Sequence, residues 1–546
     1  MLFLDFAKTC NEMEKNASRL AITNLLAKVF PTLSTDDLPI FVRFTRGKLF
    51  PDWSAEKLKF GPSLLYEALA YVIGKKKDAV IAAINGSGDT GVVIEELLEK
   101  REQTMFFSEH LELIDVYNRF IEMSRTAGRK AQQERMRSAQ YLLSNASPLE
   151  GRYLARLILE EMRIGVGESV VKDAIAKAFN IENAIIERAH QALNDLGEVA
   201  FLAKTDPKKL SEIHITPFRP VKMMLAQQSS ITEMVETHGT LAAENKYDGS
   251  RFQFHKVGKK GAIYSRRLEE MTESLPDVVN MLLSATDHDV IIDGEIIAIL
   301  NGKPMPFQTV LRRIRRKHNI DEVKEKIELK PCIFDILVCD GETLIDKPFS
   351  ERREILTSVM KDYVASQFVS DSEEDIEAYY HAALDTGNEG IMLKVRSSPY
   401  IPGNRGKYWV KIKPEVDTID LVVTGAEWGE GKRAKVFGSF ILACQDENGE
   451  LLEISRVATG IDDAMLETLY ELFKEKIIAE KGKMISLEPD VVFEVGYAEL
   501  QKSTNYPAGF ALRFPRFARL RDDKDTSEIE TLESLIHRYS MQNKEE

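Results

Sequence analysis

The feature that most constrains the fold is a change in the spacing of apolar residues along the chain. Up to about residue 214, apolar residues recur at the spacing of amphipathic helices. Two prolines in Ile213–Pro220 indicate a linker, and short β-rich runs then alternate with helical ones as far as Pro414. A chain of 546 residues has room for about three or four domains. We therefore predict a helical domain over residues 1–214, an α+β domain over 215–414 and a β domain with a C-terminal tail over 415–546.

One segment of the helical domain carries a complete signal for a helix start. Ser147 offers an N-cap, Pro148 suits the first helical position, and Glu150 is placed for a capping box. This helix breaks at Arg163–Gly167, and helical periodicity resumes over Ser169–Phe179. A Gly-x-Gly turn between two helices, next to an arginine, can bring backbone N–H groups close to a phosphate. A plain helix connection that uses glycine to turn is the alternative.

The region after Pro414 predicts a small barrel. Its strand candidates fit a five-stranded Greek-key barrel of the OB type, with a helix over Asp463–Glu480 between the third and fourth strands. The candidates are Leu421–Ala426, Val436–Cys444, Leu451–Val457, Val491–Tyr497 and Leu512–Leu520.

The composition is that of an ordinary soluble globular protein, with 44% hydrophobic and 29% charged residues. The net charge of −14 by itself argues against nucleic-acid binding, but phosphate contacts need only a local basic face, as at Arg129–Arg137 and Arg312–Lys317. The four cysteines form no C-x-x-C pair, which argues against a zinc site and a disulfide framework. No apolar run approaches ~20 residues and Met1–Asp5 lacks a basic segment, so we expect no membrane span, no signal peptide and an intracellular protein.

The middle domain contains a lysine in a distinctive setting. Lys246 precedes an Asp248–Gly249 turn and Arg251, with strand-like runs on both sides, which predicts a hairpin-like turn with the lysine at its lip. A lysine crowded by cationic groups and a metal loses its proton more easily, and its neutral amine can act as a nucleophile. Taken alone, an ordinary surface hairpin explains the same residues.

Charged and aromatic residues stand at the ends of later strand candidates. These are Asp293–Glu295, Phe334–Asp335 and Glu389–Lys394. Lys411 and Lys413 alternate with apolar residues and therefore share one face of a strand. Two neighbouring lysines repel each other, so this arrangement favours a bound anion; an edge strand protected by lysines is the alternative.

In this order the motifs resemble the nucleotidyltransferase superfamily of ATP-dependent DNA ligases and mRNA-capping enzymes. The matching patterns are K-x-D-G-x-R, D-G-E, F-D, E-G-x-M-x-K and W-x-K-x-K. The runs Arg513–Phe517 and Arg521–Lys524 resemble the final R-x-D-K element of that family. Ser147–Glu150 and Arg163–Gly167 resemble the DNA-binding domain of archaeal and eukaryotic replicative ligases. The resemblance therefore runs from the first helix to about Lys524.

The resemblance implies an enzyme that seals 5′-phosphate/3′-hydroxyl nicks in duplex DNA during replication, repair and recombination. Lys246 would attack the α-phosphate of ATP, release pyrophosphate and carry AMP. The AMP would pass to the 5′-phosphate of the nick, and the 3′-hydroxyl would then displace it. The implied cofactors are ATP and Mg²⁺ or Mn²⁺.

The resemblance also assigns roles to the residues around Lys246. Glu244 would lie at the adenine edge, and Phe334 would stack on adenine. Glu389 is the expected metal ligand, and Glu295 is expected at the ribose or the metal. The expected contacts to the ribose, the phosphates, the nick's 5′-phosphate and the pyrophosphate come from Arg251, Arg266, Arg405, Lys411, Lys413, Asp523 and Lys524.

The partners follow from the same resemblance. DNA is expected to be held by its backbone, through the helical domain and its turn residues Arg163, Gly165 and Gly167, because a ligase must seal any sequence. The segment containing Gln103, Phe106 and Phe107 resembles a shortened sliding-clamp binding motif; a loop with core phenylalanines is the alternative. We expect a cytoplasmic, archaeal-type monomer that closes around DNA as a ring of three domains.

Other classes fit the sequence less well. A capping enzyme would lack the helical domain, and most RNA ligases would lack the element at Arg521–Lys524. An NAD-dependent ligase would need a cysteine cluster for zinc. A non-catalytic DNA scaffold would have no use for a cationic pocket around Lys246.

Overall fold

The computed structural model describes residues 1–16, 18–87, 89–101, 109–300, 303–305, 309–310, 314, 328–414, 417–429, 433 and 435–542. The chain divides into two compact units, one of Met1–Ala83 with Thr90–Pro414 and one of Ile84–Asp89 with Glu415–Glu546. Because the first unit holds both the helical and the α+β regions, the division into three domains stays a prediction. Over the described part of the chain, no helix is both long and apolar enough to cross a membrane.

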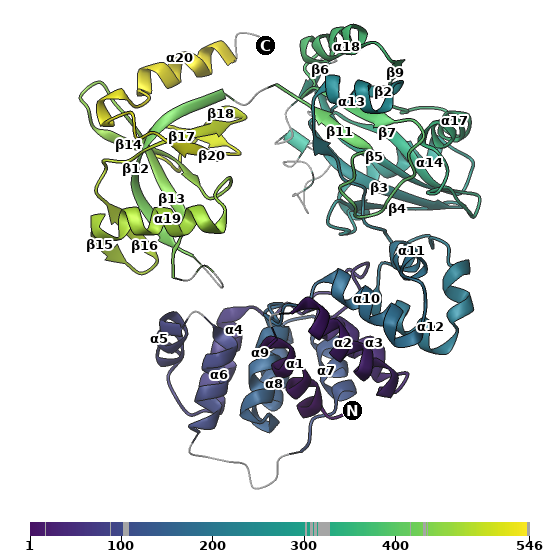
Figure 1. The fold of residues 1–546 in the computed structure, drawn as a ribbon, viewed down its shortest axis with the longest axis vertical. Helices are drawn as coiled ribbons and strands as arrows, with labels where there is room; N and C mark the ends of the chain where they lie inside the picture. The colour runs from purple at the N-terminus through teal and green to yellow at the C-terminus, as the bar shows by residue number, and fades with distance from the viewer. Residues whose placement is uncertain are drawn as a thin grey trace. The chain divides into compact units, whose positions relative to one another are not determined.

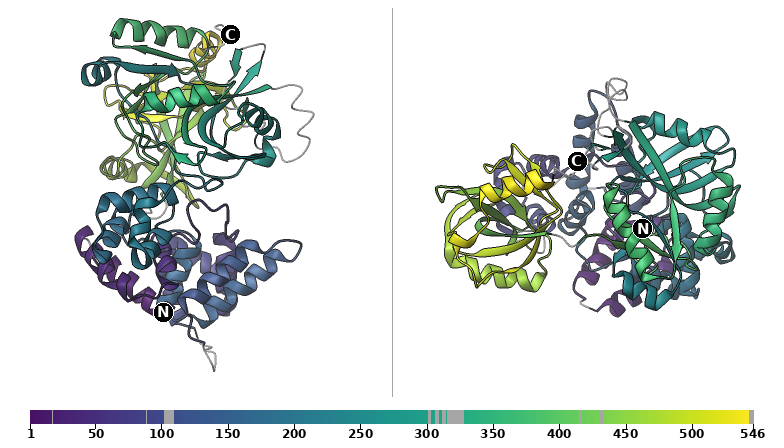
Figure 2. Two further views of the ribbon diagram at one scale, coloured as in Figure 1. Left: turned by 90° about the vertical axis from the view of Figure 1, so that its right-hand side faces the viewer. Right: turned by 90° about the horizontal axis from the view of Figure 1, so that it is seen from above.

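The region before residue 214 is built from helices, as predicted (Figures 1 and 2). The capping box is confirmed, since the Glu150 carboxylate accepts from the Ser147 N–H at 2.8 Å and the Ser147 hydroxyl accepts from the Glu150 N–H at 3.4 Å. The helices are α1 Phe3–Glu14, α2 Arg19–Val29, α3 Asp37–Thr45, α4 Pro62–Val72, α5 Lys77–Ser87, α6 Thr90–Glu99, α7 Leu113–Arg125, α8 Ala131–Asn145, α9 Pro148–Ile158, α10 Glu168–Phe179, α11 Asn183–Leu193 and α12 Leu196–Thr205, with 3₁₀ turns at Phe30–Thr32 and Pro207–Glu212.

The rest of the first unit contains two sheets flanked by helices (Figure 1). The first sheet has the strand order β1-β11-β10-β2-β9, with β1 Gln227–Gln228, β2 Leu241–Asn245, β9 Gln367–Ser370, β10 Ile391–Val395 and β11 Trp409–Ile412. The second has the order β4-β3-β5-β7-β8, with β6 also paired to β5; its strands are β3 Ser250–Val257, β4 Lys260–Ser265, β5 Val290–Leu300, β6 Lys303–Met305, β7 Glu328–Cys339 and β8 Glu342–Thr343. The helices are α13 Ile231–His238, α14 Pro276–Ser284, α17 Phe349–Val359 and α18 Glu373–Asp385.

Side-chain alternation explains how the first sheet is buried on one face. Leu241, Ala243 and Leu393 pack in a cluster that includes residues of α13 and α18. Their neighbours along β2 and β10 point to the opposite face. On that face, Trp409 joins a separate core cluster with Leu337 of β7, so the two sheets share packed side chains.

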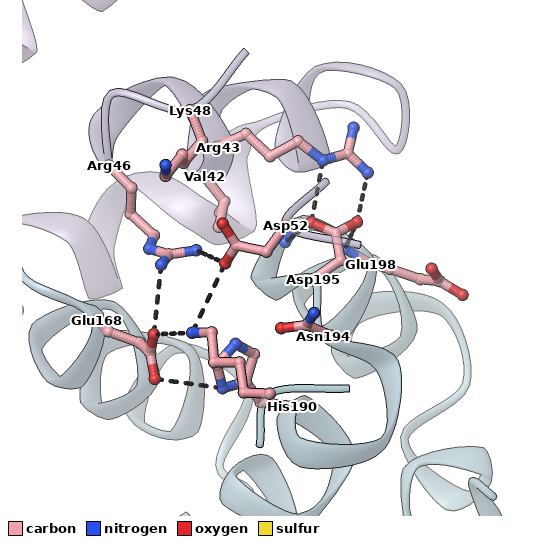
Figure 3. A network of polar contacts seen from close by, with 12 residues as sticks. Val42, Arg43, Arg46, Lys48, Asp52, Glu168, His190, Asn194, Asp195 and Glu198 are labelled. Carbon is pink, nitrogen blue, oxygen red and sulfur yellow. Dashed lines mark hydrogen bonds and ion pairs between the residues drawn. The ribbon is translucent and has the colours of Figure 1, made fainter. Parts of the chain in front are cut away.

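A network of charges joins the helical region to the start of the two-sheet region (Figure 3). The Lys222 ammonium lies 2.6 Å from the Glu168 carboxylate and 3.7 Å from that of Asp52. Arg46 contacts Asp52 at 3.1 Å and Glu168 at 3.3 Å, while the His190 Nδ1 lies 3.5 Å from Glu168. The linker expected near Ile213–Pro220 is therefore followed by a residue that is paired back to the helices.

The second unit is strand-rich and has the predicted OB order. β12, β13 and β14 pair in sequence, β17 and β20 follow on the other side of β12, and a parallel bridge from Thr459 to Arg516 closes the ring. The elements are β12 Asp417–Trp428, β13 Phe437–Gln445, β14 Leu451–Val457, α19 Asp463–Phe473, β15 Ile477–Lys481, β16 Met484–Leu487, β17 Val492–Tyr497, β18 Glu499–Lys502, β19 Phe510–Arg513, β20 Arg516–Leu520 and α20 Leu532–Gln542.

Two predicted elements of this unit are wrong in detail. The helix expected over Asp463–Glu480 ends at Phe473, and a hairpin of β15 and β16 turning at Gly482 takes its place. The strand expected over Leu512–Leu520 is two strands, because Phe514 adopts a left-handed φ of 51° and breaks the extended run.

Candidate active site

Lys246 lies on the segment that crosses from one sheet to the other. β2 ends at Asn245 and β3 begins at Ser250, but the two strands belong to different sheets. β2 is paired with β10 on one side and with β9 on the other, which leaves no free edge for β3. The expected hairpin is therefore wrong, and Lys246 stands where the chain passes between the sheets.

Backbone pairing beyond the ends of β2 and β10 sets Lys246 beside Glu389. The Lys246 N–H donates to the Gly390 carbonyl at 2.8 Å, and the Glu389 N–H donates to the Lys246 carbonyl at 3.0 Å. The Lys246 ammonium donates to the Glu389 carboxylate. Gly390 has a φ of +135°, and a Cβ there would lie 2.2 Å from the Ile412 carbonyl oxygen, so this approach requires glycine.

The charged residues of the first sheet share one face. Glu244 and Lys411 both lie opposite Met392, on its two sides, and alternation places Lys246 and Lys394 on the same face as these residues. β11 also pairs with β1 at Gln228, opposite Lys411. An edge strand protected by lysines is therefore the wrong interpretation of this segment.

Positive charge gathers around Lys411. Burial lowers the pKa of Lys411, and the charges of Lys413, Lys246 and Arg405 lower it further against the opposing effect of Glu389. The structure thus brings together Lys246, Glu389 and the segment 405–413, which are separate in the sequence. Several cations and one carboxylate on one face form a site for a polyanion such as a triphosphate.

Arg251 is held by a residue that the sequence analysis did not single out. Its Nε and Nη2 donate to the Asp293 carboxylate at 3.0 and 2.6 Å, and its Nη1 donates to the Met224 carbonyl at 2.6 Å. Against the effect of burial, the Asp293 charge raises the pKa of Arg251. The Tyr400 hydroxyl also donates to Asp293, at 2.7 Å. Asp293 is the first residue of the D-G-E motif, so its acidity next to a buried strand was the available signal.

Glu295 lies directly opposite Arg251 on the neighbouring strand. Burial raises the pKa of Glu295 to about 8, although the charges of Arg251 and Lys246 act in the other direction. Close packing explains the glycine of the K-x-D-G motif, since a Cβ at Gly249 would lie 2.4 Å from the Ile296 carbonyl oxygen and 2.9 Å from Glu295 Cγ. Glu295 therefore lies beside the Lys246 segment.

Two carboxylates near Lys246 fit a divalent cation. The Glu389 side chain is 38% exposed and can reach a hydrated ion, and an added positive charge would favour the ionised form of the half-buried Glu295 carboxyl group. Mg²⁺ needs only one or two carboxylates when water fills the remaining positions, and Mn²⁺ prefers the same oxygen ligands. The residues present thus fit either ion.

The part of this face next to Glu244 contains a buried charge that the sequence analysis gave no role. The Lys394 Nζ lies 2.6 Å from the Glu244 carboxylate and 4.4 Å from the ring centroids of Phe334 and Trp409. Phe334, expected to stack on adenine, projects from β7 toward the first sheet. A lysine inside an apolar run was the signal for Lys394, because buried lysines need a partner.

Arg266 and the turn residues Arg163, Gly165 and Gly167 were also predicted to contact phosphates. Arg266 is exposed in the turn after β4 and makes no hydrogen bond or ion pair with any other described residue. Arg163 and Gly165 have left-handed φ angles of 54° and 71°, and Gly167 is the N-cap of α10. No atom lies within 4 Å of the position of a Cβ at Gly167, so the helix N-terminus is open to approach.

Asp523 and Lys524 lie in the second unit and are held by their neighbours. The Arg521 guanidinium donates to Asp523 at 2.8 Å and to Asp420, and the Lys524 ammonium donates to Asp420 at 2.8 Å. The side-chain hydrogen bonds from Arg521 lower the pKa of Asp523. The clamp-motif residues Gln103, Phe106 and Phe107 lie outside the described residues.

Comparison with known proteins gives a consistent result. Family profiles match over residues 2–176 (DNA ligase N terminus), 223–413 (ATP dependent DNA ligase domain) and 433–524 (ATP dependent DNA ligase C terminal region). The chain is 76% identical over 546 residues to a DNA ligase of Methanocorpusculum labreanum, covering 100% of both chains. It is 58% identical over 542 residues to a DNA ligase of Methanoculleus marisnigri, covering 99% of both. A solved structure named Pmar-Lig_PreS3 shares the fold, with a TM-score of 0.60 and 17% identity over 94% of this chain and 99% of that one.

Proposed function

The chain belongs to the family of ATP-dependent DNA ligases, and we propose that Lys246 is the residue that carries AMP in its reaction. The protein is an enzyme that uses ATP to seal nicks in duplex DNA. One observation carries the assignment. The Lys246 amine lies on the same face as Lys411, beside the Glu389 carboxylate, at the point where the chain crosses between the two sheets.

In the first step, the Lys246 amine attacks the α-phosphorus of ATP. A P–N bond forms, and the bond from that phosphorus to the bridging oxygen breaks, so that pyrophosphate leaves. Only the neutral amine can attack, and the Glu389 carboxylate already accepts a hydrogen bond from it and is placed to take up the proton. Lys411 and Lys413 stabilise the negative charge that develops on the phosphate oxygens.

Glu389 and Glu295 are the residues that we assign to a divalent cation, Mg²⁺ or Mn²⁺. When bound, such an ion neutralises phosphate charge. The high pKa of Glu295 supports this role, because a carboxyl group that burial keeps protonated gains a reason to ionise when a cation is near.

We assign recognition of the base and the ribose to Glu244, Phe334 and Arg251. Glu244 accepts a hydrogen bond from the adenine amino group, and Phe334 stacks on the ring. Arg251 contacts the ribose, and its pairing with Asp293 fixes its position. Arg266 and Arg405 are exposed and bind phosphates.

The second step transfers AMP from Lys246 to the 5′-phosphate of the nick, and in the third the 3′-hydroxyl attacks that phosphate and releases AMP. The backbone N–H groups around Gly167, with Arg163 and Gly165 beside them, bind a DNA phosphate at the N-terminus of α10. Asp523 and Lys524 orient the departing pyrophosphate during the first step.

Two further assignments rest on the sequence. Gln103, Phe106 and Phe107 bind a sliding clamp through the two adjacent aromatic side chains. The enzyme acts as a cytoplasmic monomer.

The central assignment is tested by covalent labelling. The protein is incubated with α-labelled ATP and Mg²⁺, denatured, and examined for label on the chain. We expect label on the wild type and none on Lys246→Ala or Lys246→Arg, and chelation of the metal should prevent labelling. An unlabelled wild type, or equal label on Lys246→Ala, would contradict the proposal.

A further inference from the structure

The Glu244 carboxylate is buried and is held from three different elements. Lys394 of β10 donates to Oε2 at 2.6 Å, and Gln367 of β9 donates to Oε1 at 2.9 Å. The Arg353 guanidinium of α17 lies 3.7 Å from Oε1. Only 3% of the Glu244 side chain is exposed. A carboxylate that is fixed at both oxygens in this way has one orientation.

Lys394 is enclosed by aromatic rings in addition to its carboxylate partner. Its Nζ lies 4.4 Å from the centroids of Phe334 and Trp409 and 4.7 Å from that of Phe349. Burying an ammonium group is unfavourable unless it is paired, and ring faces add attraction when water is excluded. Lys394 therefore contacts both the ring expected to stack on the base and the carboxylate expected at the base edge.

We propose that Lys394 is a positioning residue for base selection: it holds Glu244 as a fixed acceptor and Phe334 as a fixed stacking surface. The inference rests on the proposed function and adds the source of the preference for adenine. An ionised carboxylate only accepts hydrogen bonds, so it pairs with the 6-amino group of adenine and repels the 6-oxo group of a guanine-like base. Without the ammonium, the buried carboxylate loses its fixed orientation, and the discrimination weakens.

Inosine triphosphate is the sharpest probe, because it differs from ATP at position 6 in carrying an oxo group in place of the amino group. The rate of covalent labelling is measured in single-turnover reactions over a range of ATP and ITP concentrations. We expect Lys394→Met to lower the ATP/ITP preference at least tenfold. The change should lie in the ATP concentration needed for half-maximal rate more than in the rate at saturation.

Lys256→Met is the matched control. Lys256 is another buried lysine of the same unit, whose Nζ donates to the His288 carbonyl at 2.9 Å. Its replacement should leave the ATP/ITP preference unchanged. If Lys394→Met fails to fold, Gln367→Leu removes the other donor to Glu244 and should lower the preference several-fold.

A double-mutant cycle identifies the route of the effect. If Lys394 acts through Glu244, adding Lys394→Met to Glu244→Gln should change the ATP/ITP preference no further. An unchanged preference in both Lys394→Met and Gln367→Leu, or equal losses with and without Glu244, would overturn the inference. A wild type that takes no label from ATP would instead refute the proposed function.

Discussion

The Arg352 guanidinium and the Asp335 carboxylate form a two-pronged ion pair in which neither side chain is exposed. The two contacts are 2.8 and 2.9 Å long, and Arg352 also donates to the carbonyls of Lys347 and Ser398. The pair fixes α17 to β7 at the residue that follows Phe334. The Asp of the F-D motif thus serves the packing of the site rather than its chemistry.

This pair should matter strongly for stability. Removing one partner leaves a buried charge without compensation, so Arg352→Met and Asp335→Asn should each lower the free energy of unfolding by roughly 3–5 kcal/mol. The double variant Asp335→Asn/Arg352→Met should lose less than the two single losses combined. Denaturant unfolding measures this, and additive losses would show that the two side chains act independently.

The acid stability of the first unit should depend on His190. Burial lowers the pKa of His190 to about 4, and the Lys222, Arg46 and Lys172 charges act with burial while Glu168 acts against it. Between pH about 6.5 and 4 the unfolded chain then holds a proton that the folded chain does not, so the free energy of unfolding falls as the pH falls.

Replacing His190 should weaken this dependence of the free energy of unfolding on pH. His190→Leu should remove a loss on the order of 3 kcal/mol between pH 7 and pH 4, at about 1.4 kcal/mol per pKa unit. Denaturant unfolding at several pH values gives the comparison. Parallel curves for variant and wild type would place the titrating group elsewhere.

For Glu295 we predict the opposite dependence of stability on pH. Its folded pKa of about 8 lies above the value of 4.5 expected for the unfolded chain, so stability is lost as the pH rises through this range. With metal chelated, Glu295→Gln should raise the melting temperature relative to the wild type, and more at pH 8 than at pH 5. Glu354→Gln, an exposed change on α17, should show no such difference. A variant that melts lower than the wild type at pH 8 would contradict the raised pKa of Glu295.

The α10 N-terminus offers a test of DNA binding that spares the fold. Gly167 has an ordinary φ of −91° and room for a Cβ, so Gly167→Ala should fold normally but weaken binding to nicked DNA several-fold by blocking close approach of a phosphate. Gly61 at the start of α4 has a φ of −92° and the same room, and Gly61→Ala should bind as the wild type does. Titration of labelled nicked duplex at fixed salt measures both. Equal affinity of all three proteins would contradict a DNA phosphate site at the N-terminus of α10.

Local sequence patterns were sufficient to predict most helices and strands. They were insufficient where pairing with residues distant in the sequence determines the structure. The capping box at Ser147 and the helical segment over Ser169–Phe179 depend on neighbouring residues and were predicted correctly. The residues around Lys246 have the same local pattern whether β2 pairs with β3 or with β9 and β10, which lie more than a hundred residues away, so the hairpin prediction failed. The periodicity of the residues after Phe473 is compatible with a helix or a strand. Their pairing with β16 makes them a strand.

The same limit applies to the site. Motif order pointed to Lys246, Glu389 and Lys411, which the structure brings together. It did not reveal that Asp293 engages Arg251 or that Lys394 engages Glu244. Such pairings depend on the register of neighbouring strands, which a single sequence does not contain.

The pairing of β2 has a consequence for the order in which the protein is made. Glu244 meets Gln367 across 123 residues and Lys246 meets Glu389 across 143, so the strand that leads to the proposed nucleophile has neither β9 nor β10 as a neighbour when it leaves the ribosome. At ordinary synthesis rates the wait is roughly ten to thirty seconds. On the proposed assignment of Lys246, a nascent chain contains its reactive lysine long before it contains a pocket, and loading with AMP reports that the first unit has been completed.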